Sequence, residues 1–270
     1  IYLRLKIFTR RGGCMEIGVQ GMNSDLLYLG WVNTSKMLEF MITGGICLNS
    51  GKRYPVFVSE KGLVGYSDFE SFYLDFIKEA KRLVHLDLKQ QDYYSENIRK
   101  NRPSFLLSSM LCDCLERGRN MHGGGAKYHD YGASQIGMPN VADGLYAIKR
   151  AVFEDKICTA EELIEALKVD FAGYDVLREK LLALPKYGQE NKEVDALMSR
   201  LSVDITNIFS SYKNRFGGNG KAVLLTFIWA PVCGALLDSE AAPEYETGDV
   251  NADGKINMFD YMMIKSIYMD

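Results

Sequence analysis

The sequence predicts a helix-rich α/β fold, and three observations lead to this expectation. Apolar residues recur at helical spacing in several segments between residues 67 and 213. Residues 1–9 and 223–229 are short apolar runs of the kind that form buried strands. Glycine-rich segments separate these runs. With 270 residues, the chain is long enough to bury a core in one or two domains.

Composition narrows the class of protein further. The formal net charge of −3 argues against nucleic acid as a partner, and no apolar run is long enough to cross a membrane. The cysteines are scattered, which favours free thiols over a disulfide framework. Because the sequence begins with Ile1, the question of a preceding signal peptide stays open.

The first half of the chain is expected to contain a strand and two helices. The strand covers residues 1–9, and a helix over residues 33–43 ends at Gly44-Gly45. A second helix begins at Ser67, which forms a capping box with Glu70. Its apolar positions follow one helical face: Phe69, Phe72, Tyr73, Phe76, Ile77, Ala80, Leu83 and Val84.

The second half is expected to be mainly helical. Pro103 opens a helix that closes at Gly118, and a glycine-rich loop covers residues 118–137. Helices are predicted at about residues 140–155, 160–168, 173–184 and 190–213, with a capping box of Thr159 and Glu162. A strand at 223–229 and an acidic linker at 238–247 follow.

Residues 249–260, DVNADGKINMFD, have the pattern of a calcium-binding loop. Oxygen ligands fall at the expected spacing, with a turn-forming glycine at position six: Asp249, Asn251, Asp253, Gly254, the Lys255 carbonyl, Asn257 and Asp260. Carboxylate and amide oxygens suit a hard cation such as calcium. The alternative is an Asx-rich turn without a metal.

The segment GDVNADGKINMFDYMMIKSIYMD, residues 248–270, resembles one type I dockerin repeat. It has Asp260 where an ordinary EF-hand loop has Glu. The resemblance implies a cohesin domain of a scaffold protein as partner, with Met258 and Phe259 at partner-recognition positions. Dockerins carry two such repeats, so the segment is interpreted as a truncated module.

Cys14 and Glu16 form a second candidate constellation. They lie two residues apart in the glycine-flanked segment GGCMEIGVQG. A thiol beside a carboxylate can act as a reactive pair, although from the local sequence alone a structural cysteine beside a solvated glutamate is the simpler interpretation.

A wider resemblance changes that interpretation. The segments GGCMEIGVQG, NTSKMLEFMITGG, CLERGRNMHGGGAKYHDYG, NVADGLYAIKRAVFEDK and PKYGQENKEVD occur in this order. From Gly12 to about Ala230, the chain resembles the glycyl radical enzymes, which include pyruvate formate-lyase and glycerol dehydratase. The resemblance implies part of a ten-stranded α/β barrel, with the catalytic domain over residues 1–237.

The same resemblance implies roles for individual residues. Cys14 matches the cysteine that becomes a thiyl radical, and Glu16 matches the general base of the G-C-x-E pattern of the dehydratases. Tyr128 and His129 match positions close to the barrel lumen. In an intact relative, a radical-activating enzyme is an expected partner.

The chain also departs from the family pattern. The glycyl radical motif R-V-x-G-Y/F is absent from the printed sequence, and Arg215-Phe216-Gly217-Gly218 does not fit it. The chain alone is therefore expected to be catalytically silent. The alternatives left open are a non-catalytic, calcium-dependent cohesin-binding protein and an artificial joining of two coding pieces. The enzyme resemblance implies the cytoplasm and the dockerin resemblance the cell exterior.

Three weaker patterns are set aside. Cys112 and Cys114 are two apart on a predicted helix, so they could not easily share zinc with His122 and His129. Gly123–Gly125 and residues 217–221 lack the ending of a phosphate-binding P-loop. His85 lies within a helical pattern and is interpreted as a packed or surface residue.

Overall fold

The computed structural model describes residues 9–11, 17–24 and 31–224, which form two compact units. Unit 1 contains the described residues among 1–32, together with 81–135 and 205–224; unit 2 contains residues 33–80 and 136–204. The expected strand at 1–8, most of the one at 223–229, the linker and the tail lie outside the described residues.

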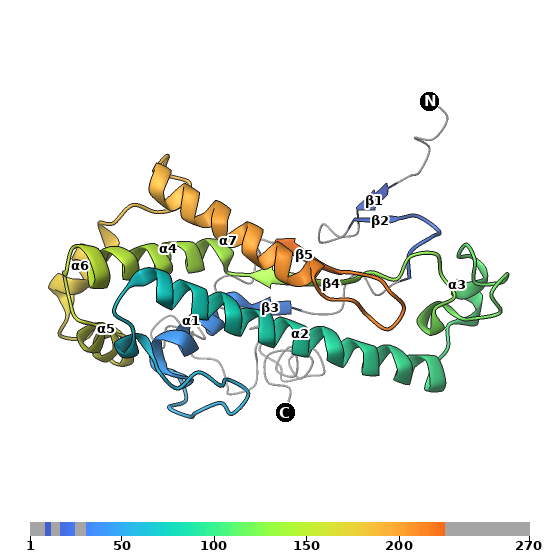
Figure 1. The fold of residues 1–270 in the computed structure, drawn as a ribbon, viewed down its shortest axis with the longest axis horizontal. Coiled ribbons are helices and arrows are strands. Elements are labelled where there is room, and N and C mark those ends of the chain that lie inside the picture. Colours follow the sequence, from blue (N-terminus) through green and yellow to red (C-terminus); the bar gives the residue numbers. More distant parts are fainter. Residues whose placement is uncertain (1–8, 12–16, 25–30, 225–270) are drawn as a thin grey trace, which may run out of the picture. The chain divides into compact units, whose positions relative to one another are not determined.

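The described strands form two small sheets (Figure 1). β1 (Thr9–Arg11) and β2 (Ile17–Val19) are antiparallel. β3 (Trp31–Asn33), β4 (Tyr131–Ile136) and β5 (Gly220–Leu224) form a second sheet in the order β3-β4-β5. β4 and β5 are parallel, with Tyr131 opposite Gly220.

β4 corrects one expectation, because the segment 118–137 was predicted to be a loop throughout. All of its residues, YGASQI, are buried. A strand covered on both faces shows no alternation of apolar and polar residues. Its small residues therefore gave no strand signal in the sequence.

Helices of unit 1 pack close to this sheet. α2 (Phe69–Asn101) contributes its residues 81–101 and α7 (Lys192–Ser210) its last turns. Two short helices, α3 (Phe105–Ser109) and η4 (Met121–Gly123), also belong to unit 1. A Cβ on Gly220 would lie 2.5 Å from the carbonyl oxygen of Phe209 and 3.0 Å from Leu88. Glycine at this position therefore lets β5 approach both α7 and α2.

Unit 2 is built around a helix pair. α1 (Thr34–Thr43) begins where the Asn33 side chain accepts the Lys36 N–H, and it ends at Gly44 with a φ of 70°. This confirms the helix expected at 33–43. α1 packs on α4 (Met138–Ile148), which continues as the π-helical segment η5 (Lys149–Glu154). A Cβ on Gly144 would lie 3.0 Å from Leu38, so the two helices approach closely there.

The remaining elements of unit 2 are η3 (Leu63–Gly65), α5 (Ala160–Lys168), α6 (Asp175–Leu182) and the first part of α2 and α7. The apolar face predicted for α2 is buried in this unit at Phe69, Phe72, Tyr73, Phe76 and Ala80. The helices expected at 140–155, 160–168, 173–184 and 190–213 are confirmed with ends shifted by a few residues.

Of the two capping boxes predicted from the sequence, one is confirmed and the other is wrong. The Thr159 capping box is present, with Glu162 N–H donating to Thr159 Oγ1 at 3.1 Å and Thr159 N–H to Glu162 at 2.8 Å. At α2, however, Asp68 Oδ1 accepts the Ser71 N–H at 2.9 Å, so Asp68 caps the helix and the predicted box of Ser67 and Glu70 is wrong.

The helix expected from Pro103 to Gly118 is also wrong over most of its length. α3 ends at Ser109, and turns follow. Asp113 has a φ of 72°, a left-handed conformation that cannot continue a right-handed helix. Cys112 and Cys114 therefore lie in turns.

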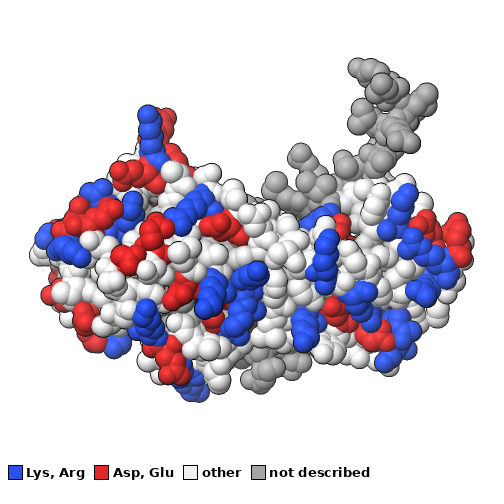
Figure 2. Space-filling view, in the orientation of Figure 1, with Lys and Arg blue, Asp and Glu red and all other residues white. Residues whose placement is uncertain are grey.

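Charged side chains of both signs are interspersed on the face shown in Figure 2. In unit 2, Arg200 binds both carboxylate oxygens of Glu70 at 2.8–2.9 Å, and its guanidinium lies 3.9 Å from the centre of the Tyr73 ring. In the described part of the chain, no helix is both long and apolar enough to cross a bilayer.

Candidate active site

The β1–β2 hairpin holds the two ends of the segment that contains Cys14 and Glu16. Arg11 pairs with Ile17 and Thr9 with Val19. Cys14 and Glu16 themselves lie outside the described residues. The hairpin nevertheless fixes the two positions at which the chain enters and leaves this segment.

The turn that follows β2 ties the hairpin to the loop that contains Tyr128. Tyr128 donates its N–H to the Met22 carbonyl at 3.0 Å, and its own carbonyl accepts the Ser24 N–H at 3.0 Å. Asn23 is paired with Tyr128 in a parallel bridge, and its side chain accepts the Val19 N–H at the end of β2. A backbone connection therefore joins one predicted site segment to the other within unit 1.

A further hydrogen bond holds the same turn from another side. The Cys112 N–H donates to the Gly21 carbonyl at 2.8 Å. The turns after α3 and the loop before β4 thus both fix the exit of the hairpin. Tyr128 is 38 % exposed, and Lys127 Nζ lies 5.9 Å from the centre of its ring.

His129 is buried beside the turn that connects α7 with β5. Its ring centre lies 5.1 Å from that of Phe216, and its carbonyl accepts a hydrogen bond from the Asn214 side chain. Burial, reinforced by the charge of Arg117, lowers the pKa of the imidazole. The ring is therefore neutral near pH 7, as a hydrogen-bonding or proton-accepting group would be.

Glycines allow these segments to pack at contact distance. A Cβ on Gly218 would lie 2.3 Å from the His129 carbonyl oxygen, and one on Gly124 would lie 2.8 Å from the Phe216 ring. The chain from Gly123 to Gly125 thus approaches a protein ring and backbone. This close packing accounts for the glycine run without a phosphate ligand.

Two guanidinium groups brace the same loop through its carbonyl oxygens. Arg117 donates to the Ala126 carbonyl at 3.0 Å and pairs with Asp113 at 2.7 Å. Arg215 donates to the His122 carbonyl at 3.1 Å and to Ser95 Oγ at 3.0 Å. These charge-assisted bonds hold the backbone that leads into Tyr128 and His129.

Asp92 of α2 lies at the centre of a polar network that the sequence did not reveal. Its two oxygens accept the hydroxyl of Tyr131 at 2.7 Å and that of Tyr212 at 3.0 Å, and Ser95 Oγ lies 3.2 Å from the Tyr131 hydroxyl. Burial, together with the negative charge of Asp92, raises the pKa of both tyrosines. The network fixes the start of β4 and the segment directly after α7 on one helix.

Metal sites are not formed by the candidate ligands that the structure describes. Cys112 is exposed, Cys114 is buried, and His122 and His129 are both buried. Within the described ranges, no group of three or more His, Cys, Asp and Glu side chains could hold a metal ion. The proposed calcium loop at 249–260 lies outside these ranges.

The sequence profile of the pyruvate formate lyase-like family matches residues 10–233. The chain belongs to this family.

Individual relatives agree with this assignment. The chain is 27 % identical to trans-4-hydroxy-L-proline dehydratase of Clostridioides difficile over 207 residues, which are 76 % of this chain and 25 % of that protein. It is 26 % identical to (2S)-3-sulfopropanediol dehydratase of Klebsiella oxytoca, with 76 % of this chain and 25 % of that protein covered.

Solved structures show the same similarity. The C. difficile hydroxyproline dehydratase superimposes with a TM-score of 0.72 at 25 % identity, covering 79 % of this chain and 27 % of that one. A Roseburia inulinivorans structure concerned with 1,2-propanediol dehydration gives a TM-score of 0.69 at 29 % identity, covering 78 % and 27 %. The chain therefore spans about a quarter of the length of these relatives.

Proposed function

We propose that this chain forms the cysteine-bearing part of a glycyl radical lyase or dehydratase. The main support for this proposal is the β1–β2 hairpin, whose strands flank the segment with Cys14 and Glu16. The turn after this hairpin is hydrogen-bonded to Tyr128. Cys14, Glu16 and Tyr128 all lie within residues 10–233, which match the family. The catalytic domain covers residues 1–237 in this proposal.

In the proposed reaction, the Cys14 sulfur removes a hydrogen atom from a substrate carbon, and Glu16 moves the accompanying proton. A carboxylate two residues from the thiol suits these two roles, because one short segment then carries both the group that removes the hydrogen atom and the group that moves the proton. A glycyl radical supplies the oxidising equivalent in this family. The printed sequence lacks its motif, so activity requires a glycine from outside these 270 residues.

The substrate class follows from the relatives, which are dehydratases of hydroxyproline and of a sulfonated propanediol. We propose a small hydroxylated molecule. Tyr128 is the described candidate for contact with it, because its side chain is partly exposed and its backbone is joined to the hairpin.

A chimera tests this proposal. Residues 10–233 replace the matching segment of the C. difficile dehydratase, which provides the glycyl radical, and its activating enzyme generates that radical. Turnover of hydroxyproline should disappear in Cys14→Ser and Glu16→Gln, while the glycyl signal in electron paramagnetic resonance persists. Turnover that survives Cys14→Ser contradicts the assigned role.

The isolated chain provides a second check. It should show no glycyl-type signal after treatment with the activating enzyme, because it lacks the radical motif. A signal from the isolated chain would overturn the expectation that it is silent alone.

The second candidate function concerns residues 248–270, after a linker at 238–247. The ligand pattern from Asp249 to Asp260 supports one calcium ion, and Met258 and Phe259 are the proposed contacts to a cohesin domain. Calorimetric titration should give about one calcium per chain, which Asp249→Asn together with Asp260→Asn abolishes. Absence of calcium-dependent heat in the unaltered chain removes this candidate.

A further inference from the structure

A second cluster of reactive side chains lies in unit 2, along α1 and in the turn that follows this helix. Cys47 is 1 % exposed, and its carbonyl accepts the Gly51 N–H at 2.8 Å. This closes the turn and brings Ser50 back onto the thiol, which receives hydrogen bonds from Ser50 and from the Lys36 side chain. Lys36 lies in the first turn of α1, so the contact joins two separate segments.

Glu39 completes the cluster. Its Oε1 accepts Lys36 Nζ at 2.6 Å and the Leu48 N–H at 2.8 Å. Glu39 is only 5 % exposed, and its Oε2 is buried without a hydrogen-bond partner. A buried carboxylate oxygen with unused accepting capacity is costly, and it is available to take a proton.

Cys47 differs from the other buried cysteines of the described chain. Burial raises the pKa of the Cys47 thiol, but the Ser50 and Lys36 hydrogen bonds and the Lys36 charge outweigh burial and hold it below its usual value. Burial raises the pKa of Cys114 and Cys158. Thiolate is the reactive form of cysteine, so we expect peroxide to oxidise Cys47 more readily than Cys114 or Cys158.

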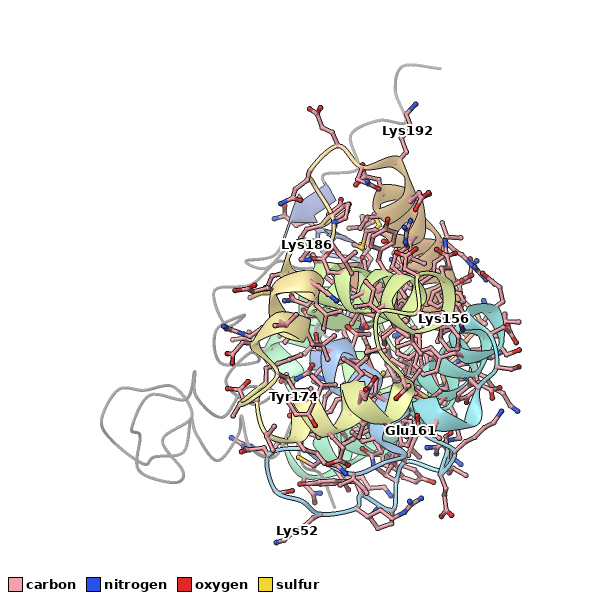
Figure 3. All side chains as sticks on the ribbon, turned by 90° about the vertical axis from the view of Figure 1, so that its left-hand side faces the viewer. Lys52, Lys156, Glu161, Tyr174, Lys186 and Lys192 are labelled. Carbon is pink, nitrogen blue, oxygen red and sulfur yellow. The ribbon has the colours of Figure 1, made fainter. Side chains whose placement is uncertain are left out.

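The residues that follow Cys47 in the turn reach the surface. Asn49, Ser50, Gly51 and Lys52 are exposed. Figure 3 shows Lys52 at the outer edge of the turn, pointing away from the ribbon. A small opening of this turn would admit a molecule the size of hydrogen peroxide.

We propose that Lys36 and Cys47 form a covalent sulfur–nitrogen cross-link when the protein meets hydrogen peroxide. The thiolate attacks the peroxide O–O bond, which gives a sulfenic acid and hydroxide. Lys36 passes one proton to Glu39, and its free amine attacks the sulfur. The S–N bond forms as the S–O bond breaks, and the oxygen leaves as water. Cysteine and lysine together lose two hydrogen atoms, and peroxide is reduced to two waters.

The cross-link would tie the start of α1 to the turn 47–51. It is independent of the chemistry proposed for Cys14, since no residue is shared. Because a thiol can attack the sulfur of the S–N bond, a reducing thiol should reverse it.

Mass spectrometry of the full 270-residue chain tests the inference. After peroxide treatment and digestion, the peptides that contain Lys36 and Cys47 should be joined, lighter by two hydrogen atoms and separated again by a thiol. Lys36→Arg should keep fast formation of sulfenic acid at Cys47 but give no cross-link, because the guanidinium is a poor nucleophile. Lys36→Met should slow sulfenic acid formation on the order of tenfold, through loss of the charge that favours the thiolate.

Lys52→Met is the matched control, because it removes a lysine of the same turn that points into solvent. Lys52→Met should leave unchanged the rate of sulfenic acid formation at Cys47 and the rate of cross-linking to Lys36. The inference is overturned if Cys47 reacts no faster than Cys158, or if Cys47 is oxidised to sulfinic acid while Lys36 stays unlinked. Circular dichroism establishes that each variant is folded. The other contrary outcome, sulfinic acid at Cys47 with Lys36 unlinked, is measured in the unaltered chain and needs no variant.

Discussion

The hydroxyl of Tyr131 donates to Asp92 at 2.7 Å, which connects the first residue of β4 to the C-terminal half of α2. Tyr131 has no exposed surface. Its hydroxyl therefore depends on this carboxylate and on Ser95 for its hydrogen bonds. Because Tyr212 uses the other oxygen of Asp92, one side chain holds three elements of unit 1 together.

Asp92→Ala should therefore destabilise the protein. Hydrogen bonds to a charged partner contribute about 1.5–3 kcal/mol, and a buried hydroxyl left unpaired adds to the loss. We expect the free energy of unfolding in urea to fall by about 2 to 3 kcal/mol. Asp92→Asn, which retains one acceptor oxygen, should lose less.

Glu161→Gln is the control for the Asp92 variants, since Glu161 is exposed on α5 and should change stability by less than about 0.5 kcal/mol. If Asp92→Ala unfolds at the same urea concentration as the unaltered chain, the network does not contribute to stability.

The glycine pair Gly217-Gly218 allows a sharper comparison. A Cβ on Gly218 would lie 2.3 Å from the His129 carbonyl, whereas one on Gly217 meets nothing within 4 Å. Gly217 has a φ of 82°, so alanine there costs only the backbone strain of about 1 to 2 kcal/mol. Gly218→Ala should cost at least about 1 kcal/mol more, because it pushes the turn away from His129.

Thermal unfolding monitored by circular dichroism measures both glycine variants side by side. Gly218→Ala should also increase hydrogen exchange at the Tyr131 amide, which donates to Asn219 in the same turn at 2.9 Å. Equal losses of stability in the two variants would mean that the turn shifts to accommodate a Cβ at Gly218 without a cost in free energy.

These predictions depend on contacts that the sequence did not reveal. Asp92 is 39 residues from Tyr131 and 120 from Tyr212, so no local pattern identifies it as their partner. The helices α2, α4 and α7 were predictable because each displays its apolar face within a few turns. α3 was predicted too long because the left-handed Asp113 has no signal in residue type alone.

The candidate site was predictable only in part. The GGCMEIGVQG and KYHDYG segments identified the Cys14 and Tyr128 regions by resemblance. Their connection through Met22 and Ser24 uses backbone groups, which every residue possesses, and so leaves no trace in the sequence.

Alkaline pH should weaken unit 2 through Tyr66. Burial, together with the hydrogen bond and charge of Asp75, raises the pKa of Tyr66 to about 12. An unfolded tyrosine loses its proton near pH 10, so the folded state binds more protons between about pH 10 and 12. The stabilisation is therefore complete below about pH 10 and is lost as pH rises toward 12.

Unfolding measured between pH 8 and 11.5 should show this loss, and Tyr66→Phe should make the decline less steep. Tyr93→Phe is the matched control, since Tyr93 is 65 % exposed. Identical pH profiles for Tyr66→Phe and the unaltered chain would show that Tyr66 does not govern this transition.

Asn23 should control how firmly the hairpin is anchored. Its side-chain oxygen accepts the Val19 N–H, and its backbone is bridged to Tyr128. Asn23→Ala removes the acceptor, so protection of the Val19 amide against hydrogen exchange should fall by roughly tenfold, the equivalent of about 1.4 kcal/mol. Asn23→Asp retains an acceptor oxygen and should preserve the protection.

Asn49→Ala serves as the control, because Asn49 is exposed and belongs to unit 2, whereas the hairpin belongs to unit 1. It should leave exchange at Val19 and Tyr128 unchanged. If Asn23→Ala also leaves them unchanged, then the backbone bonds from Tyr128 to Met22 and Ser24 suffice to hold the hairpin exit. In the chimeric enzyme, the same variant should lower turnover without lowering the glycyl signal, because it loosens the segment that carries Cys14 rather than the source of the radical.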